Sequence, residues 1–147
     1  MPEEKTVDSE RVVCTPSDFA KNSLVYLQEA GWLKALKRHV SLRSHLDSWL
    51  FLIVKKGSGT LVYQGERYFL QAGDCAFLDC RKEYSHETDD SLWELGWAHF
   101  NGNTVKDILR FFPIQPVFHP VQPDLFLLMR MPPRLRSQTG KIEHGFR

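Results

Sequence analysis

The sequence has few cysteines, no long apolar run and no charge imbalance, and each of these shortages excludes a class of protein. Its three cysteines are an odd number and none belongs to a C-x-x-C pair, so neither a disulfide framework nor a zinc site is expected. Cys75 and Cys80 are instead predicted to be small buried side chains on opposite faces of a strand.

Apolar and charged residues are distributed as in a soluble protein. The longest apolar run, Trp49–Val54, is too short to span a bilayer, and the acidic stretch Met1–Ser9 is unlike a secretion signal. Lys and Arg (19) nearly balance Asp and Glu (18), and the resulting net charge of +1 argues against a dedicated nucleic-acid-binding domain. We therefore expect a cytoplasmic protein without membrane contacts.

What is present is typical of one globular domain of 147 residues. Short segments rich in β-branched and aromatic residues alternate with turn signals, which predicts a mainly β sandwich or barrel. The clearest predicted strands are Trp49–Lys55, expected to be buried on both faces, Cys75–Cys80 and Leu92–Phe100. A short hairpin is expected around Gln64-Gly65-Glu66.

The N-terminal region is harder to assign. Residues 1–14 carry four Asp or Glu residues and little apolar periodicity, so they are predicted to form a flexible arm. Thr15–Asp18 indicates a turn or a helix start, and Ser23–Gln28 a first strand. Trp32–Val40 fits either a helix or a strand.

Beyond Gly102 the periodicity becomes helical. Thr104–Asp107 resembles a capping box, and one helix face is formed by Val105, Ile108, Leu109 and Phe112. A second short helix is expected over 124–131, between prolines. We therefore expect an arm at 1–14, a barrel at 15–102, a helical extension and possible dimerisation element at 103–131, and a disordered polar tail at 132–147.

Two segments carry a resemblance to a known family. They are SWLFLIVKKGSGTLVYQGERYFLQAGDCAFLDCRKEYSH at 48–86 and LWELGWAHFNG at 92–102, with weaker matches at 15–33 and 39–43. They resemble the N-terminal ligand-binding and dimerisation domain of arabinose-operon-type (AraC) transcriptional regulators. The resemblance implies a cupin-like double-stranded β-helix, or jelly-roll barrel, followed by one or two short α-helices. It also implies a small-molecule effector, often a sugar, and a possible homodimer.

Members of that family normally continue into two helix-turn-helix units, and too few residues follow Phe112 to hold them. The chain is thus expected to be an effector-binding sensor domain that contacts DNA only through a domain it lacks. An isolated piece of a regulator, a truncated gene product and a frame-shifted fragment all stay open as explanations.

The strand Leu92–Phe100 holds most of the predicted ligand-binding residues. Alternate positions place Trp93, Leu95, Trp97 and His99 on one face. A sugar needs a flat apolar surface and a few hydrogen-bonding groups, which this face offers, although the same rings could simply fill the barrel. The resemblance places Trp97 where effector sugars stack on a tryptophan.

Three more residues complete the predicted ligand-binding set: Arg43, Tyr84 and His86. The resemblance places Arg43 just before the strand that opens the barrel, and His86 where a pocket tyrosine or histidine occurs. Tyr84 replaces what is often a histidine. The five donors of a guanidinium suit sugar hydroxyls or a carboxylate, while a solvated surface arginine and an exposed loop histidine are the alternative interpretations.

A small metal-dependent cupin enzyme acting on a sugar or metabolite is the alternative function. Such enzymes usually offer a His-x-His, a Glu and a later His. The barrel region has His39, His45, His86 and His99 but no His-x-His, and Trp49–Thr60 contains neither His nor Glu. No G-x-S-x-G motif is present either. We therefore expect a binding protein without catalytic residues, metal or cofactor.

Overall fold

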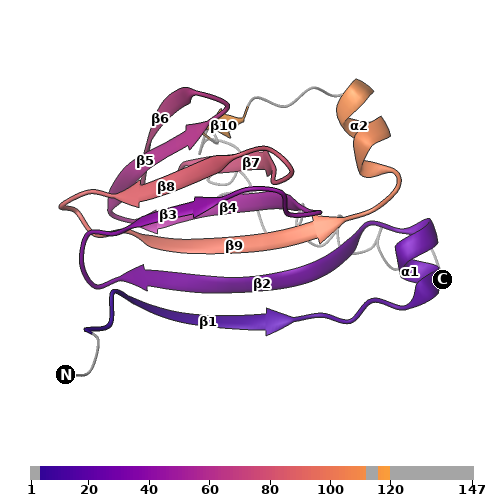
Figure 1. Cartoon of the computed structure of the whole chain (residues 1–147), viewed down its shortest axis with the longest axis horizontal. Helices are drawn as coiled ribbons and strands as arrows, with labels where there is room; N and C mark the ends of the chain where they lie inside the picture. The colour runs from indigo at the N-terminus through magenta and orange to yellow at the C-terminus, as the bar shows by residue number, and fades with distance from the viewer. Residues whose placement is uncertain (1–3, 112–115, 120–147) are drawn as a thin grey trace, which may run out of the picture.

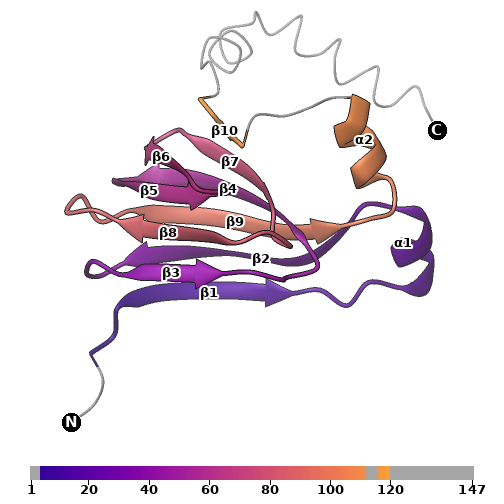
Figure 2. The same cartoon turned by 45° about the horizontal axis from the view of Figure 1, so that its top comes forward.

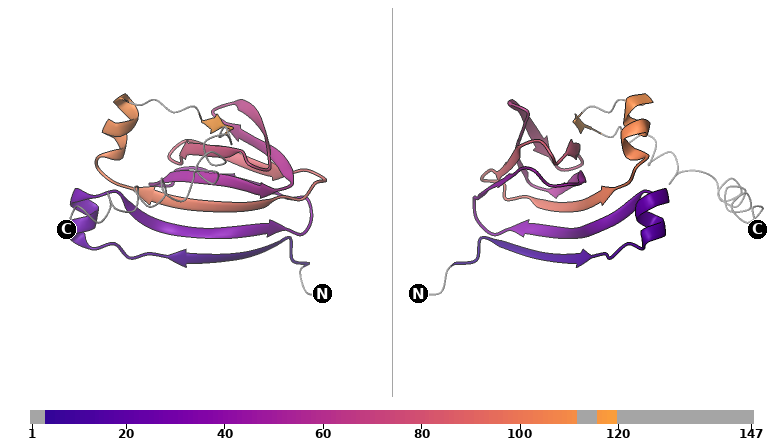
Figure 3. Two further views of the ribbon diagram at one scale, coloured as in Figure 1. Left: turned by 180° about the vertical axis from the view of Figure 1, so that it is seen from behind. Right: turned by 45° about the vertical axis from the view of Figure 1, so that its right-hand side comes forward.

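The structure is a computed structural model that describes residues 4–111 and 116–119, and two antiparallel β-sheets dominate this part of the chain (Figure 1, Figure 2). The larger sheet has the strand order β1-β2-β9-β4-β7-β10, and the smaller one the order β3-β8-β5-β6. The strands are β1 (Val7–Val13), β2 (Tyr26–Ala35), β3 (Val40–Arg43), β4 (Trp49–Lys56), β5 (Ser58–Tyr63), β6 (Glu66–Gln71), β7 (Cys75–Asp79), β8 (Tyr84–Thr88), β9 (Glu94–Asn101) and β10 (Val117–Phe118). The described helices, α1 (Asp18–Ser23) and α2 (Val105–Phe111), lie at the same end of the sheets (Figure 3). The predicted mainly β fold with short helices is confirmed.

The predicted hairpin is present, and a second turn precedes β7. Gln64 and Gly65 join β5 to β6 with φ angles of 52° and 81°, the left-handed geometry that suits a two-residue hairpin. The turn before β7 is closed by Asp74, whose Oδ2 accepts a hydrogen bond of 2.8 Å from the backbone N–H of Gln71. Both turns set the register of the strands that follow them.

The N-terminal segment differs from the prediction of a flexible arm. Val7–Val13 form β1, which pairs with β2 along its whole length, from Val7 opposite Ala35 to Val13 opposite Glu29 (Figure 1). The segment lacks apolar periodicity because β1 is an edge strand, and edge strands in natural sheets commonly carry charged residues. Its pairing comes from backbone hydrogen bonds to β2, which composition alone does not reveal.

The segment after β1 also departs from the predicted boundaries. Ser17 caps α1, its hydroxyl accepting a 3.1 Å hydrogen bond from the N–H of Ala20, so Thr15–Asp18 is indeed a helix start. The first strand expected at Ser23–Gln28 is instead β2, which begins at Tyr26 and runs on to Ala35. Because β2 is paired on both sides, by β1 and β9, the strand interpretation of its second half prevails over the helical one.

The core lies between the sheets, and its buried residues come from β2, β4, β5, β6, β7, β8 and β9 and the loops beside them. In β4, Leu50, Leu52 and Val54 are buried, whereas Trp49 and Phe51 on the opposite face stay half-buried. The prediction that this strand is buried on both faces is therefore wrong for its outer face. There Trp49 stacks on Phe77 of β7 with ring centroids 5.8 Å apart, and aromatic contacts cover that face of the sheet. Two predicted buried thiols, of Cys75 and Cys80, are 2% and 0% exposed.

The Trp93 ring packs directly against Gly59, where a larger residue would clash with it. Trp93 is 0% exposed, and a Cβ on Gly59 would lie 2.4 Å from Cζ3 of its ring. Gly59 lies inside β5, not in a turn. Its missing side chain instead makes room for the indole.

Gly59→Ala is expected to lower the free energy of unfolding by about 2–3 kcal/mol, because overpacking a well-filled core forces side chains or backbone to move. The matched control is Gly65→Ala: its Cβ would meet nothing within 4 Å, and only the φ of 81° opposes it, at a cost of roughly 1 kcal/mol. Urea unfolding of both variants checks this. Equal losses in the two variants would contradict the close packing of Trp93 on Gly59.

The predicted helix after the barrel is present as α2. On the predicted apolar face, Val105 is 4% exposed and Leu109 is half-buried, whereas Ile108 is 49% exposed, so only part of this face is covered. Phe112, the helix expected at 124–131 and the tail at 132–147 lie outside the described residues, and dimerisation through this region stays a prediction. Within residues 4–111 and 116–119, no helix is long and apolar enough to cross a membrane.

Candidate functional site

A cavity of about 350 Å³ lies between the inner faces of the two sheets. The larger sheet contributes β1, β2, β4 and β9 to its walls, and the smaller sheet contributes β3 and β8. This volume falls at the lower end of the range of small-molecule sites. The lining residues are Val7, Ser9, Arg11, Glu29, Leu33, Ser41, Arg43, Leu50, Leu52, Tyr84, His86, Leu95, Trp97 and His99.

Six of the seven predicted ligand-binding residues line this cavity, and the seventh does not. The six are Arg43, Tyr84, His86, Leu95, Trp97 and His99. Trp93 is not among the lining residues: its buried ring packs against Gly59 and, with centroids 5.8 Å apart, against the ring of His86. Trp93 therefore fills the barrel, as the alternative interpretation of these aromatics allows, and stands behind the cavity wall.

Trp97 supplies a flat apolar surface held by its neighbours. It faces Gly31 on the adjacent β2, where a Cβ would lie 2.8 Å from the indole, so the ring rests directly on the strand. Its Nε1 donates a 3.3 Å hydrogen bond to Oε1 of Glu29, and Oε2 of Glu29 lies 3.7 Å from a guanidinium nitrogen of Arg11 on β1. The indole is thus fixed between β1, β2 and β9.

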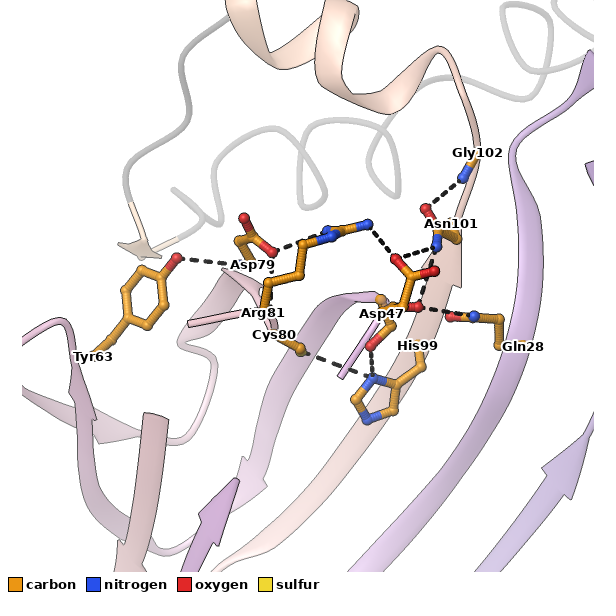
Figure 4. Close-up of polar contacts among 10 residues, drawn as sticks. Gln28, Asp47, Tyr63, Asp79, Cys80, Arg81, His99, Asn101 and Gly102 are labelled. Carbon is orange, nitrogen blue, oxygen red and sulfur yellow. Dashed lines mark hydrogen bonds and ion pairs between the residues drawn. The ribbon is translucent and has the colours of Figure 1, made fainter. Parts of the chain in front are cut away.

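The imidazole of His99 lies beside two polar groups, the Ser48 hydroxyl and the Cys80 thiol (Figure 4). Its Nδ1 shares a 2.9 Å hydrogen bond with the hydroxyl of Ser48 and lies 3.9 Å from Sγ of Cys80. Desolvation lowers the pKa of His99 below its ordinary value, so the imidazole is neutral at pH 7. Burial raises the pKa of the Cys80 thiol, which keeps it protonated and unreactive.

The loop before β4 keeps Ser48 in place. Asp47 accepts hydrogen bonds from Arg81 at 2.6 Å and from Nδ2 of Asn101 at 3.3 Å, and Arg81 also binds Asp79 at 3.0 Å (Figure 4). The Arg81 guanidinium lies 5.5 Å from the ring centre of Trp49. These contacts anchor the loop to β7 and β9, and so orient the hydroxyl that holds His99.

Tyr84 and His86 enter the cavity from β8. Burial raises the pKa of Tyr84 far above its usual range, so its phenol is a neutral hydrogen-bonding group. Burial is also the main reason that the pKa of His86 falls to about 4, with the nearby charges of His39 and Arg43 acting in the same direction. At neutral pH both side chains therefore offer polar tips without charge.

Several lining residues were missed in the sequence, chiefly those on β1 and β2. Ser9 and Arg11 were assigned to an arm, and Glu29 and Leu33 lay in segments without a clear strand assignment. The signal that could have found them is the alternation over 26–35, which places Glu29, Gly31 and Leu33 on one face of an extended segment. That alternation is visible only once the helical interpretation of the segment is set aside.

The described part of the chain holds no cluster suited to a transition metal. Within it, no group of three or more His, Cys, Asp or Glu side chains is arranged to hold one ion. His86 and His99 line the same cavity, but the acidic side chain among its lining residues, Glu29, is engaged by Trp97 and Arg11. The donor set thus fits hydrogen bonding to an organic molecule better than metal coordination.

The two sheets around an inner cavity define a cupin-type barrel, and comparison with solved structures shows the same fold. Similar structures include the Schizosaccharomyces pombe Cnp3 cupin domain (TM-score 0.53, 8% identity, 74% of this chain and 73% of that one). Others are an HTH_3 family transcriptional regulator from Vibrio cholerae (0.51, 12%, 68% and 54%) and a predicted oxalate decarboxylase from Thermotoga maritima (0.50, 16%, 63% and 78%). At these identities the likeness shows the fold alone.

Within this class the sequence identifies the family. The model of the AraC-like ligand binding domain matches residues 33–142, and the chain belongs to that family. A comparison with curated protein sequences finds no match.

Proposed function

We propose that this chain is the effector-binding sensor domain of an AraC-type transcriptional regulator, and that its cavity binds a molecule of sugar size. The observation that carries the proposal is the wall formed by Trp97 and its polar neighbours: a flat indole beside carboxylate, imidazole and phenol groups that line one cavity. The apolar C–H face of a sugar packs on such a ring, while its hydroxyls need donors and acceptors around the rim.

Binding in this cavity would directly affect the N-terminal strand β1. Ser9 and Arg11 of β1 belong to the cavity wall, so a bound molecule would contact both β1 and the barrel. An effector that favours one arrangement of β1 shifts the population toward it, by as much as its affinity differs between the two states. The described helices are separated by strands β2–β9 and form no helix-turn-helix unit, so contact with DNA is assigned to another part of the regulator.

Binding without catalysis fits the chemistry of the cavity. The thiol of Cys80 and the phenol of Tyr84 are both held protonated, and neither is an activated nucleophile. A metal-dependent cupin enzyme is the second candidate, because the fold is shared with a predicted oxalate decarboxylase. Metal analysis of the purified protein separates the two: one equivalent of Fe, Mn, Ni or Zn per chain would favour the enzyme.

Trp97→Ala is expected to weaken effector binding about 10- to 30-fold, the equivalent of about 1.4–2 kcal/mol. Isothermal titration against a panel of pentoses, hexoses and hexuronic acids measures this. The matched control is Trp32→Ala, which removes an indole from the opposite face of β2 and should leave affinity within about twofold of the parent. Unchanged affinity in Trp97→Ala removes this ring from the site, and absence of binding to the whole panel contradicts the sugar assignment.

A further inference from the structure

The charged groups of the cavity do not cancel. Its formally charged lining residues are Arg11, Glu29 and Arg43. One oxygen of the Glu29 carboxylate accepts a hydrogen bond from Nε1 of Trp97 at 3.3 Å, and the other lies at ion-pair distance, 3.7 Å, from Arg11. Arg11 and Glu29 thus offset each other, which leaves the charge of Arg43 without a counterpart in the wall.

Arg43 is placed as a free donor at the cavity. Among the residues that the structure describes, no carboxylate lies within ion-pair distance of it, and its guanidinium donates to a protein acceptor only at the carbonyl of Leu42, at 3.2 Å. A guanidinium has five N–H donors in a fixed fork that matches a carboxylate. Most of that fork is therefore available to a molecule in the cavity.

The polar groups around Arg43 are neutral. Arg43 lies opposite Tyr84 in the pairing of β3 with β8, and its charge contributes to lowering the pKa values of both His86 and His99. Tyr84 stays a phenol, because burial raises its pKa. None of these three groups supplies a negative charge at neutral pH, and none competes with the guanidinium as a cation.

We infer that the molecule bound in this cavity carries a carboxylate that pairs with the guanidinium of Arg43, so that the effector is a sugar acid rather than a neutral sugar. This inference rests on the proposed function and narrows it. One carboxylate balances the one uncompensated positive charge, and its two oxygens match the two parallel donors of the fork. The hydroxyl-bearing remainder of the molecule then lies against Trp97 and the neutral polar tips.

The test compares acid and neutral sugars of the same shape. Isothermal titration of the full chain with glucuronate and galacturonate is set against glucose and galactose, for the parent protein, Arg43→Gln and Arg43→Lys. We expect the parent to bind at least one hexuronate 30-fold or more tighter than its neutral counterpart, by the strength of a charge-assisted bidentate pair. Arg43→Gln should remove that preference, weakening hexuronate binding at least tenfold more than it weakens neutral-sugar binding, and Arg43→Lys should restore the preference in part.

The control variant is Arg38→Gln, and the possible outcomes distinguish a failure of the carboxylate pairing from a failure of sugar binding altogether. Arg38→Gln removes another exposed arginine, which lies near Glu87 and Asp90 and is not among the residues of the cavity wall, and should leave the preference intact. Equal binding of acid and neutral sugars by the parent overturns the inference and keeps the function. Absence of binding by either kind overturns both. A loss in Arg43→Gln that is the same for both kinds, with thermal melts unchanged, also overturns the role of Arg43 as a carboxylate partner.

Discussion

Replacing Trp93 with alanine is expected to lower the free energy of unfolding by about 3–5 kcal/mol, the range for deleting a large aromatic ring from a packed core. The side chain is 0% exposed and fills the space beside Gly59 and the ring of His86. A loss of this size is a large part of the total stability of a small domain, so the variant is expected to unfold near physiological temperature. Urea unfolding followed by circular dichroism measures it.

Two further variants show whether the effect comes from packing. Phe69 is 60% exposed on β6, and Phe69→Ala should change stability by less than about 0.5 kcal/mol. Trp93→Phe keeps an aromatic ring and removes an indole N–H that is buried without a hydrogen-bond partner in the described structure, so it should recover most of the loss. A Trp93→Ala protein that keeps full stability but loses ligand binding would instead return this residue to the site.

Alternation along a strand predicts which face a side chain lies on, but Trp93 shows that it does not predict contact with the cavity. The pattern correctly placed Leu95, Trp97 and His99 on the inner face of β9, since side chains two apart share a face. It could not show where along that face the cavity ends. That boundary is set by Gly59 on β5, a strand distant in sequence, whose missing side chain lets the Trp93 ring close the space. The sequence therefore predicted that these side chains point inward, but it could not predict which of them line the cavity.

In the fold as well, features set by residues near one another in the sequence were predictable, whereas features set by pairing with a distant segment were not. The hairpin at Gln64-Gly65 and the cap at Ser17 depend on residues within about four positions of one another, and the sequence predicted the hairpin and the helix start. The edge strand β1 depends on backbone pairing with β2, about twenty residues away, and its own composition indicates an arm. Because β1 carries Arg11, missing the strand also hid the partner that balances Glu29 in the cavity.

Acidification should destabilise the protein through His86. In the unfolded chain this imidazole binds a proton near its ordinary pKa of 6.5, whereas burial lowers its pKa in the folded protein to about 4. Between these two values the unfolded state holds more protons, so stability is fully present above pH 6.5 and is lost as the pH falls toward 4. At about 1.4 kcal/mol per pH unit, the loss amounts to about 3 kcal/mol over this range, and His99, whose pKa is also lowered, adds to it.

The slope of stability against pH is the measurement that assigns this loss to one residue. His86→Gln keeps a polar side chain of similar length but has no group that titrates, so between pH 6.5 and 4.5 its stability should fall much less than that of the parent. His45→Asn is the matched control: His45 is exposed, with a φ of 56° that asparagine tolerates, and its replacement should leave the parent slope unchanged. If His86→Gln and the parent lose stability in parallel, the proton that unfolds the protein binds elsewhere, and the imidazole beside Trp93 is not held neutral by its enclosure.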